Sequence, residues 1–351
     1  MKGNAIVGQS GGPTAVINAS LVGLVEAALA SQSVDRVYGT RWGIRGLLDG
    51  ELVDFTEVEP DRLTTLKFTP SSALGSTRYK LQDDDLPHVL EALKARNIRY
   101  FFLIGGNDTM ETIHRVEKYC RKNGYDLTGV GIPKTVDNDL FGTDHTPGFP
   151  SAARDIALTV QQAGRLARDM QKVDQYAVFQ AIGRDSGWLA ASASLARRDA
   201  ADAPHLVYVP EVPMNAKRFL SDVTRCIERN GYAYIVCGEG VLWEDGTPVS
   251  ASSTTDEFSN IEFGAMGGVS AAMSLHRLIN EHTGYRGEFQ ITESIPMCGA
   301  DRVSEKDREE AYGCGREAMR LAAGGHSGVM VTIRRVQADP YAYEFGTERL
   351  S

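Results

Sequence analysis

Short apolar runs alternate along the chain with longer segments in which apolar residues recur every three to four positions. The short runs have the length of buried strands, and the longer segments have the period of amphipathic helices. The predicted strands are 5–7, 34–38, 100–104, 127–132, 176–182, 206–209, 232–237, 288–292 and 329–333. The predicted helices are 15–30, 84–97, 109–122, 151–171, 215–230, 267–282 and 305–323. This alternation predicts an α/β fold with mainly parallel sheets covered by helices.

The size of the chain indicates a division into two lobes. A chain of 351 residues can bury a large core, which we expect to be divided between two lobes. A boundary is plausible near Pro147-Gly148-Phe149-Pro150, where two prolines bracket a turn.

Charge and cysteine content exclude several classes of protein. The net charge of −9 argues against nucleic-acid binding, which needs a basic face. The five cysteines show no metal-ligand spacing and are expected to be reduced core residues. No signal peptide precedes the first strand, and no apolar run approaches the ~18–20 residues of a membrane span. We therefore expect a cytoplasmic protein with no membrane partner.

The richest chemistry follows the fourth predicted strand, in Pro133-Lys134-Thr135-Val136-Asp137-Asn138-Asp139. Open α/β sheets build their sites at the carboxyl ends of strands. One aspartate can accept a proton from a hydroxyl while the other organises a metal, and the lysine neutralises phosphate charge. A polar turn is the alternative, because Asn and Asp favour turns.

Two glycine loops follow other predicted strands. Gly8-Gln9-Ser10-Gly11-Gly12-Pro13-Thr14 leads into a helix, whose amino terminus offers N–H groups to a phosphate. A tight connection without a ligand is the alternative. The same arrangement of glycines before a helix amino terminus recurs in Gly105-Gly106-Asn107-Asp108-Thr109. Asp108 would either help to hold Mg²⁺ or exclude a longer phosphate chain, unless it only caps the helix.

A basic loop, Leu74-Gly75-Ser76-Thr77-Arg78-Tyr79-Lys80, lies between these two in the sequence. Arg78 and Lys80 could supply the positive charge that phosphoryl transfer needs in its transition state. A solvated basic turn is the alternative reading of this segment.

Together these segments resemble the phosphofructokinase family, which includes ATP- and pyrophosphate-dependent enzymes. The matches occur in order over nearly the whole chain: SGGPT, LGSTR, GGNDT, PKTVDND, GTDHTPGF, IGRDSG and GEG. The resemblance implies two stacked three-layer α/β lobes with the active site in the cleft between them. It implies a donor lobe of 1–148 plus about 296–340, and an acceptor lobe of about 149–295 plus the C-terminal end.

The resemblance also implies a role for each matching residue. Asp137 would be the base, with Arg78 and Lys134 as the other catalytic residues. The donor phosphates would be bound by Gly11, Gly12, Gly106, Asn107, Asp108 and Lys134. The acceptor would be bound by Thr135, Asp137, Asp139, Ile182, Gly183, Arg184, Glu239 and Arg286. Mg²⁺, the implied cofactor, would be held by Asn107, Asp108 and Asp139.

Two positions indicate the phosphate donor. ATP-using members commonly read GGDGS and PGTIDND where this chain reads GGNDT and PKTVDND. Asp108 would fill the room needed by the inner phosphate of a nucleotide, and Lys134 would bring an ammonium group to pyrophosphate. Both differences are typical of the pyrophosphate-dependent members.

The acceptor end departs from the family pattern. In the family, arginines bind the 6-phosphate of the sugar. In this chain they are replaced by Gln175 and by the segment 293–298, which leaves Arg286 as one possible ligand of the 6-phosphate. Arg302 or Lys306 could substitute for the missing arginines.

The implied reaction is therefore reversible, Mg²⁺-dependent transfer from pyrophosphate to the C1 hydroxyl of fructose 6-phosphate, by a homodimer or homotetramer. A different sugar or polyol acceptor is the main alternative. ATP as donor, an NAD-kinase-like enzyme and a non-catalytic sugar-phosphate sensor rank lower.

Overall fold

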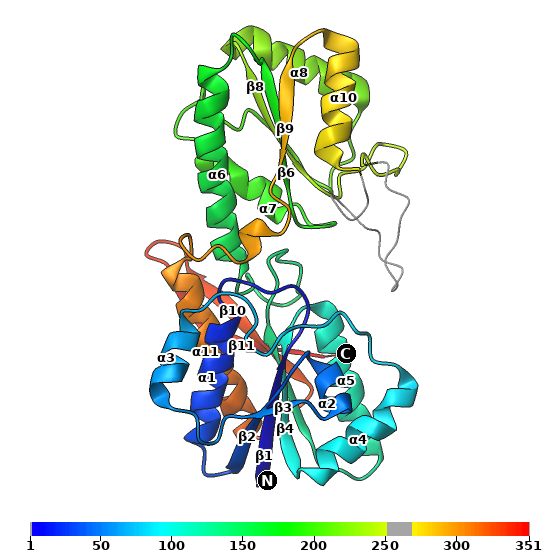
Figure 1. Ribbon diagram of the computed structural model, residues 1–351, viewed down its shortest axis with the longest axis vertical. Helices are drawn as coiled ribbons and strands as arrows, with labels where there is room; N and C mark the ends of the chain where they lie inside the picture. Colours follow the sequence, from blue (N-terminus) through cyan, green and yellow to red (C-terminus); the bar gives the residue numbers. More distant parts are fainter. Residues whose placement is uncertain (1, 251–268, 351) are drawn as a thin grey trace. The chain divides into compact units, whose positions relative to one another are not determined.

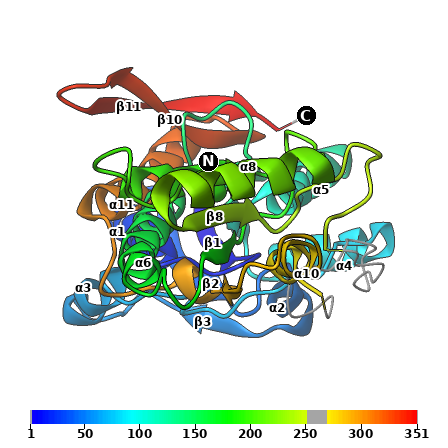
Figure 2. The ribbon, with the colours of Figure 1, turned by 90° about the horizontal axis from the view of Figure 1, so that it is seen from above.

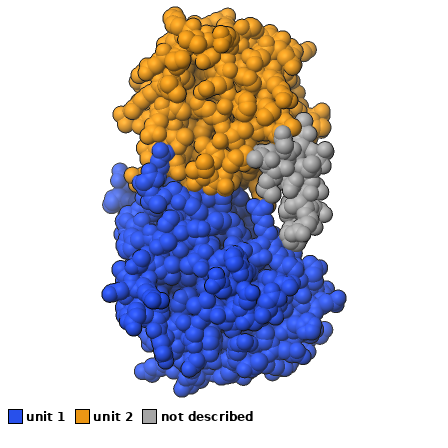
Figure 3. All heavy atoms as spheres, viewed as in Figure 1, with its two compact units in different colours: residues 1–151, 297–351 blue, residues 152–296 orange. Residues whose placement is uncertain are grey.

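The computed structural model describes residues 2–250 and 269–350, and these form two compact units. Unit 1 comprises residues 1–151 and 297–351, and unit 2 comprises residues 152–296 (Figure 3). The C-terminal end belongs to unit 1, which corrects its assignment to the acceptor lobe. The reason is that the last strand pairs with its neighbour from Val329 opposite Arg349 to Gln337 opposite Ala342.

Unit 1 is built on a seven-stranded sheet in the order β11-β10-β5-β4-β1-β2-β3. The pairs β10–β11 and β2–β3 are antiparallel, and the other pairs are parallel. The strands are β1 (Gly3–Gln9), β2 (Val34–Thr40), β3 (Leu52–Asp54), β4 (Ile98–Gly105), β5 (Thr128–Pro133), β10 (Val329–Gln337) and β11 (Ala342–Arg349). Helices cover both faces of this sheet (Figure 1).

Along the central strands, successive side chains point to opposite faces of the sheet, and this gives unit 1 two hydrophobic cores. In β4, Tyr100 and Phe102 enter one core and Phe101 and Leu103 enter the other. The first core is closed by α1 (Ile17–Leu29), α3 (Pro60–Lys67) and α11 (Glu305–Ala323). The second is closed by α2 (Ile44–Asp49), α4 (Leu86–Ala95) and α5 (Asn107–Lys122), with a 3-10 turn at Asp83–Asp85 before α4.

Helices α1 and α11 lie side by side although they come from opposite ends of the sequence (Figure 1). Each contributes a glycine to the contact. A Cβ on Gly23 would lie 2.0 Å from the carbonyl oxygen of Tyr312, and one on Gly315 would lie 2.0 Å from that of Ser20. The close approach of the two helices therefore depends on the absence of side chains at these positions.

Unit 2 contains a parallel four-stranded sheet in the order β7-β8-β6-β9. Its strands are β6 (Tyr176–Ala181), β7 (Leu206–Tyr208), β8 (Ala233–Gly238) and β9 (Gly287–Ile291). Helices α8 (Ala216–Asn230) and α10 (Ala271–Thr283) share one core with the sheet. Helix α6 (Phe149–Asp169) runs on the other side of the sheet from α10 (Figures 1 and 2). Helix α7 (Trp188–Ser192) and two 3-10 turns, Ala193–Ala196 and Ile295–Met297, complete the described elements.

The predicted α/β class with mainly parallel sheets is confirmed. The sequence pattern missed α2, β3, α3, α7 and β11, which are short or have no clear hydrophobic period. The predicted final strand, 329–333, extends to Gln337 and is not the last one. Residues 267 and 268 of the predicted helix 267–282 lie outside the described residues. No helix among the described residues is long and apolar enough to cross a membrane.

Candidate active site

Three loops of unit 1 follow adjacent parallel strands at the carboxyl edge of the seven-stranded sheet. The pairing runs to Gln9 in β1, Gly105 in β4 and Pro133 in β5. The three loops therefore start side by side along this edge of the sheet. This is the edge at which open α/β sheets bind ligands. The glycine loops and the PKTVDND segment, which the sequence predicts as site elements, are brought together here.

Lys134 is the cation at the centre of this edge. Its side chain is only 3% exposed, and its Nζ donates a hydrogen bond to the carbonyl oxygen of Gly12 at 2.6 Å. Gly11 has φ +74°, and a Cβ there would lie 3.0 Å from the same Nζ. Burial lowers the pKa of Lys134 to about 8, although Asp137 and Asp139 act in the opposite direction. The ammonium group is thus mostly charged at pH 7 and lies against the backbone of the first glycine loop.

The basic loop is tied to the first glycine loop by its backbone. The amide of Gly11 donates to the carbonyl oxygen of Thr77 at 3.1 Å, and the hydroxyl of Ser76 bonds to the carbonyl oxygen of Gly11. Arg78, the residue after Thr77, is therefore held next to the first glycine loop. Its side chain is exposed, and it makes no hydrogen bond or ion pair within the described parts of the chain. It is available to an anion.

Two buried amides that the sequence pattern did not single out hold the basic loop in place. Gln9 accepts a bond from the amide of Leu74 at 2.9 Å, and Asn18 accepts one from the amide of Ala73 at 3.0 Å. The two side chains also bond to each other at 2.9 Å, and both are at most 1% exposed. In the sequence, Gln9 stands in the first glycine loop and Asn18 in the predicted helix 15–30, and neither was assigned a role.

The second glycine loop opens a helix directly. Helix α5 begins at Asn107, two residues before the predicted start, so Asn107 and Asp108 belong to its first turn. Both side chains are exposed, and Asp108 is well placed for the positive end of the helix dipole. A Cβ on Gly105 would lie 2.1 Å from the hydroxyl of Thr109, so the turn requires glycine there.

The aspartates of the third loop flank a left-handed residue. Asn138 has φ +57°, a conformation that asparagine tolerates better than most residues. Asp137 is half-buried, and its amide donates to the hydroxyl of Thr135 at 3.1 Å. Asp139 is exposed and accepts a bond from the side-chain amide of Asn107 at 3.0 Å. The second and third loops are therefore connected through Asn107 and Asp139.

The oxygen donors at this edge fit a magnesium ion that arrives with phosphates. Mg²⁺ prefers oxygen ligands and is usually held by one or two carboxylates together with substrate phosphates. Asp139 provides one carboxylate, Asn107 beside it provides an amide oxygen, and Asp108 lies one residue along the same helical turn. Within the described residues there is no group of three His, Cys, Asp or Glu side chains that could hold a metal without a substrate.

Four of the residues expected to hold the acceptor lie in unit 2 at the carboxyl ends of β6 and β8: Ile182, Gly183, Arg184 and Glu239. Glu239 is buried, and its Oε1 accepts bonds from the amides of Gly183 at 3.1 Å and Arg184 at 2.7 Å. Arg184 has φ +50° and an exposed side chain, and Ile182 is half-buried. Glu239 therefore shapes the turn that presents the Arg184 guanidinium group.

Arg286 is not brought together with these groups. It directly precedes β9, and β9 pairs in parallel with β6 from Gly287 opposite Tyr176. Its backbone amide bonds to the side chain of Gln175, which directly precedes β6. In parallel strands the two ends lie at opposite edges of the sheet, so Arg286 and Gln175 are at the far edge of unit 2 from Gly183, Arg184 and Glu239.

The cysteines fit their expected reduced state, with one difference in placement. All five are free, and four are buried. Cys298 is half-buried near Lys134, and burial raises the pKa of its thiol.

This arrangement of glycine loops, a buried lysine and paired aspartates at one sheet edge gives an α/β protein the groups that phosphate binding and proton transfer require. Comparison with known proteins is more specific. The family model described as phosphofructokinase matches residues 4–322. The chain belongs to the phosphofructokinase family, whose members are phosphotransferases, and the resemblance predicted from the motifs is confirmed.

Individual relatives agree with this assignment. The pyrophosphate–fructose 6-phosphate 1-phosphotransferase of Halomonas elongata is 35% identical over 97% of this chain and 82% of its own length. A solved structure of a pyrophosphate-dependent phosphofructokinase from Nitrosospira multiformis has a TM-score of 0.89 at 33% identity, covering 99% of this chain and 83% of the other. A sulfofructose kinase of Alkalicoccus urumqiensis is 31% identical over 96% of this chain and 85% of its own length.

Proposed function

We propose that this protein transfers a phosphoryl group reversibly from pyrophosphate to a hydroxyl of a phosphorylated sugar, with the C1 hydroxyl of fructose 6-phosphate as the default acceptor. The name of the Halomonas relative supports this donor and acceptor, since its similarity extends over almost the whole chain. Residues of unit 1 would bind the donor, and residues of unit 2 would bind the acceptor.

The position of the Lys134 ammonium group is the observation that supports pyrophosphate as the donor. Its ammonium group lies 2.6 Å from the carbonyl oxygen of Gly12, within the loop that offers backbone N–H groups to phosphate. A short, highly charged donor without a nucleoside needs more cationic charge and less room than ATP. Asp108 stands in the first turn of α5, where a longer phosphate chain would meet its carboxylate. Gly11, Gly12, Gly106 and Asn107 would contribute the remaining donor contacts.

Asp137 would act as the general base. It would take the proton of the acceptor hydroxyl while the hydroxyl oxygen bonds to the transferred phosphorus and the bond to the leaving phosphate breaks. Inorganic phosphate is then the second product. Arg78 and Lys134 would stabilise the negative charge of the transferring group. When bound with pyrophosphate, Mg²⁺ would neutralise phosphate charge, held by Asp139, Asn107 and Asp108.

Gly183, Arg184 and Glu239 would hold the sugar, with Thr135 and Ile182 touching it from their own segments. Arg286 lies at the opposite edge of unit 2, so we do not assign it to the sugar-binding group of its own chain. Among the described residues, Arg184 is therefore the cation that we assign to a 6-phosphate at this edge. This favours, as a second candidate, an acceptor with a different far end, and the similarity to a sulfofructose kinase supports that alternative.

A matrix of donors and acceptors tests both versions. Pyrophosphate and ATP would each be assayed with Mg²⁺ against fructose 6-phosphate and against fructose derivatives whose C6 group is uncharged or monoanionic. We expect pyrophosphate to support turnover and ATP to be poor. A KM for fructose 6-phosphate in the micromolar range with high kcat would exclude the second acceptor class. Efficient turnover with ATP would overturn the proposed donor.

A further inference from the structure

The loop that carries Asp137 is joined to a second segment of unit 1 by a set of short bonds. Asn138 Oδ1 accepts from the amide of Thr146 at 2.9 Å, and the Thr146 hydroxyl donates to the carbonyl oxygen of Thr135 at 2.7 Å. Thr135 also forms a β-bridge with Gly148. Thr146 is fully buried. Segments 135–138 and 146–148 are thus held together on both sides of Asp137.

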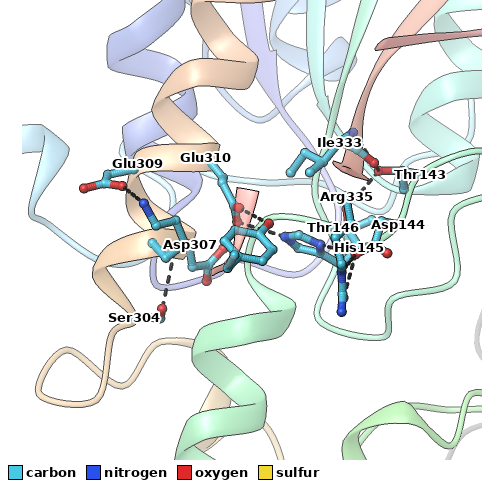
Figure 4. A network of polar contacts seen from close by, with 12 residues as sticks. Thr143, Asp144, His145, Thr146, Ser304, Asp307, Glu309, Glu310, Ile333 and Arg335 are labelled. Atoms are coloured by element: carbon cyan, nitrogen blue, oxygen red, sulfur yellow. Dashed lines mark hydrogen bonds and ion pairs between the residues drawn. The ribbon is translucent and has the colours of Figure 1, made fainter. Parts of the chain in front are cut away.

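His145, the residue before Thr146, lies between two carboxylates. The His145 ring contacts Asp144 through Nδ1 and Glu310 of α11 through Nε2, at 2.8 Å in both cases (Figure 4). Arg335 of β10 bonds to Asp144 at 2.9 Å, and the hydroxyl of Tyr341 bonds to Glu310. Burial alone would lower the pKa of His145, but its bonds to Glu310 and Asp144 raise it. His145 is therefore held between two carboxylates, and Arg335 bonds to the outer one, Asp144.

Further contacts fix the same segment to the frame of unit 1. The Thr143 hydroxyl accepts from the amide of Ile333 at 2.9 Å, and the amide of Asp144 donates to the carbonyl oxygen of Ile333 at 2.8 Å. Asp307 of α11 accepts the amide of Gly148 at 2.9 Å. The segment 143–148 is consequently held by β10 on one side and by α11 on the other.

We propose that Asn138, Thr146 and His145 are positioning residues for the base: Thr146 and Asn138 fix the loop of Asp137, and His145 holds Thr146 through Asp144 and Glu310. This inference rests on the proposed function, because it assigns these residues to the base of that reaction. Phosphoryl transfer depends on orientation, and a misplacement of about 1 Å can cost on the order of 10²-fold in rate. None of the three side chains is required to touch a substrate.

Substitutions at Thr146 test the connection to the loop. Thr146→Val removes the hydroxyl and keeps the shape and the amide, whereas Thr146→Ser keeps the hydroxyl. We expect Thr146→Val to lower kcat by about 10- to 100-fold and to leave the KM for pyrophosphate within about twofold, since Lys134 and Gly11 are unchanged. Thr146→Ser should restore most of the kcat. Thr40→Val is the matched control, because Thr40 is also fully buried and its hydroxyl bonds to the carbonyl oxygen of Gly43 at 2.8 Å.

A double-mutant cycle tests the role of His145. If His145 acts through Thr146, the single variant His145→Gln should lower kcat. The double variant His145→Gln/Thr146→Val should then have a kcat only slightly below that of Thr146→Val. Arg334→Gln, which breaks an exposed ion pair with Glu344 on the same hairpin, should have no effect. Should His145→Gln fail to fold, Arg335→Gln takes its place in the cycle. Fully additive losses would overturn the role of His145.

Hydrogen exchange separates this inference from the proposed function. In Thr146→Val, amides of the peptide 134–140 should exchange faster than in Thr146→Ser, whether or not a substrate has been found. A wild-type protein that is inactive with every acceptor would refute the proposed function. Equal exchange in the two variants, or a kcat of Thr146→Val equal to that of Thr40→Val, would overturn the positioning role.

Discussion

Lys134→Met separates the contribution of Lys134 to stability from its contribution to catalysis. The buried ammonium group is expected to bind pyrophosphate, yet its burial is unfavourable for the folded protein. Methionine has a similar length and no charge. We therefore expect Lys134→Met to be nearly inactive with pyrophosphate and more stable than the wild-type protein at pH 7.

The magnitude follows from the pKa of Lys134. Burial lowers it from 10.5 to about 8, which corresponds to about 3 kcal/mol at about 1.4 kcal/mol per pH unit. Loss of the hydrogen bond to the carbonyl oxygen of Gly12 offsets about 1 kcal/mol, so the net stabilisation at pH 7 is about 2 kcal/mol. Between pH 8 and 10.5 the unfolded chain binds more protons at this group than the folded chain does. Wild-type stability therefore gains from this group as the pH rises through that window, and the advantage of the variant shrinks.

Urea unfolding of the wild-type protein and Lys134→Met at pH 7, 8, 9 and 10 measures the difference in unfolding free energy. Lys118→Met is the control, because Lys118 is an exposed lysine on α5, and it should change stability by less than about 0.5 kcal/mol at every pH. In parallel, kcat/KM for pyrophosphate should fall by about 10²–10³-fold in Lys134→Met. A variant that is less stable than the wild-type protein at pH 7, or a difference that does not change above pH 8, would refute the reasoning.

Three further substitutions test the assigned roles. Asp137→Asn keeps the shape of the base but cannot accept a proton, so kcat should fall by about 10²–10⁴-fold at unchanged urea midpoint, and near-normal turnover would contradict the mechanism. Asp108→Gly removes the carboxylate from the first turn of α5, and the ratio of kcat/KM for ATP to that for pyrophosphate should rise; an unchanged ratio counts against its role in donor choice. Asp139→Asn weakens an oxygen ligand, so a Mg²⁺ titration should show a higher half-saturating concentration, and an unshifted titration would remove Asp139 from the metal site.

The sequence predicts most of the donor edge because that edge is local in the chain. Each of its loops begins at the end of an apolar run, so strand prediction alone locates Gly11, Gly106 and Lys134 at strand ends. Parallel pairing then brings these ends together. The contact between Lys134 and the carbonyl oxygen of Gly12 is not visible in the sequence, because it depends on which strands are neighbours.

Residues whose function depends on long-range contacts escape such prediction. Gln9 looks like a polar residue of the first glycine loop and Asn18 like a polar interruption of a helix, and only the folded chain shows that they bond to the basic loop. Arg286 shows the same dependence. The resemblance implies it as an acceptor ligand, but its position before β9 instead of after it puts it at the opposite edge of the sheet from Gly183, Arg184 and Glu239 of its own chain.

Edge strands are the least predictable elements of the fold. In β11, half-buried and exposed side chains alternate irregularly, so no period of two separates a core face from a solvent face. β3 has three residues and extends the sheet at its other edge. Both strands are specified by backbone pairing with a neighbour, which apolar periodicity does not report.

The close contact of α1 with α11 has a consequence for synthesis of the chain on the ribosome. α1 is synthesised before unit 2, but the helix that covers it is made only after all of unit 2. Until then the apolar face of α1 and the glycine gap at Gly23 remain uncovered. Unit 2 is continuous in sequence and can complete its own sheet first. The part of unit 1 that precedes unit 2 therefore exposes an apolar surface while unit 2 is synthesised, a state that chaperones bind.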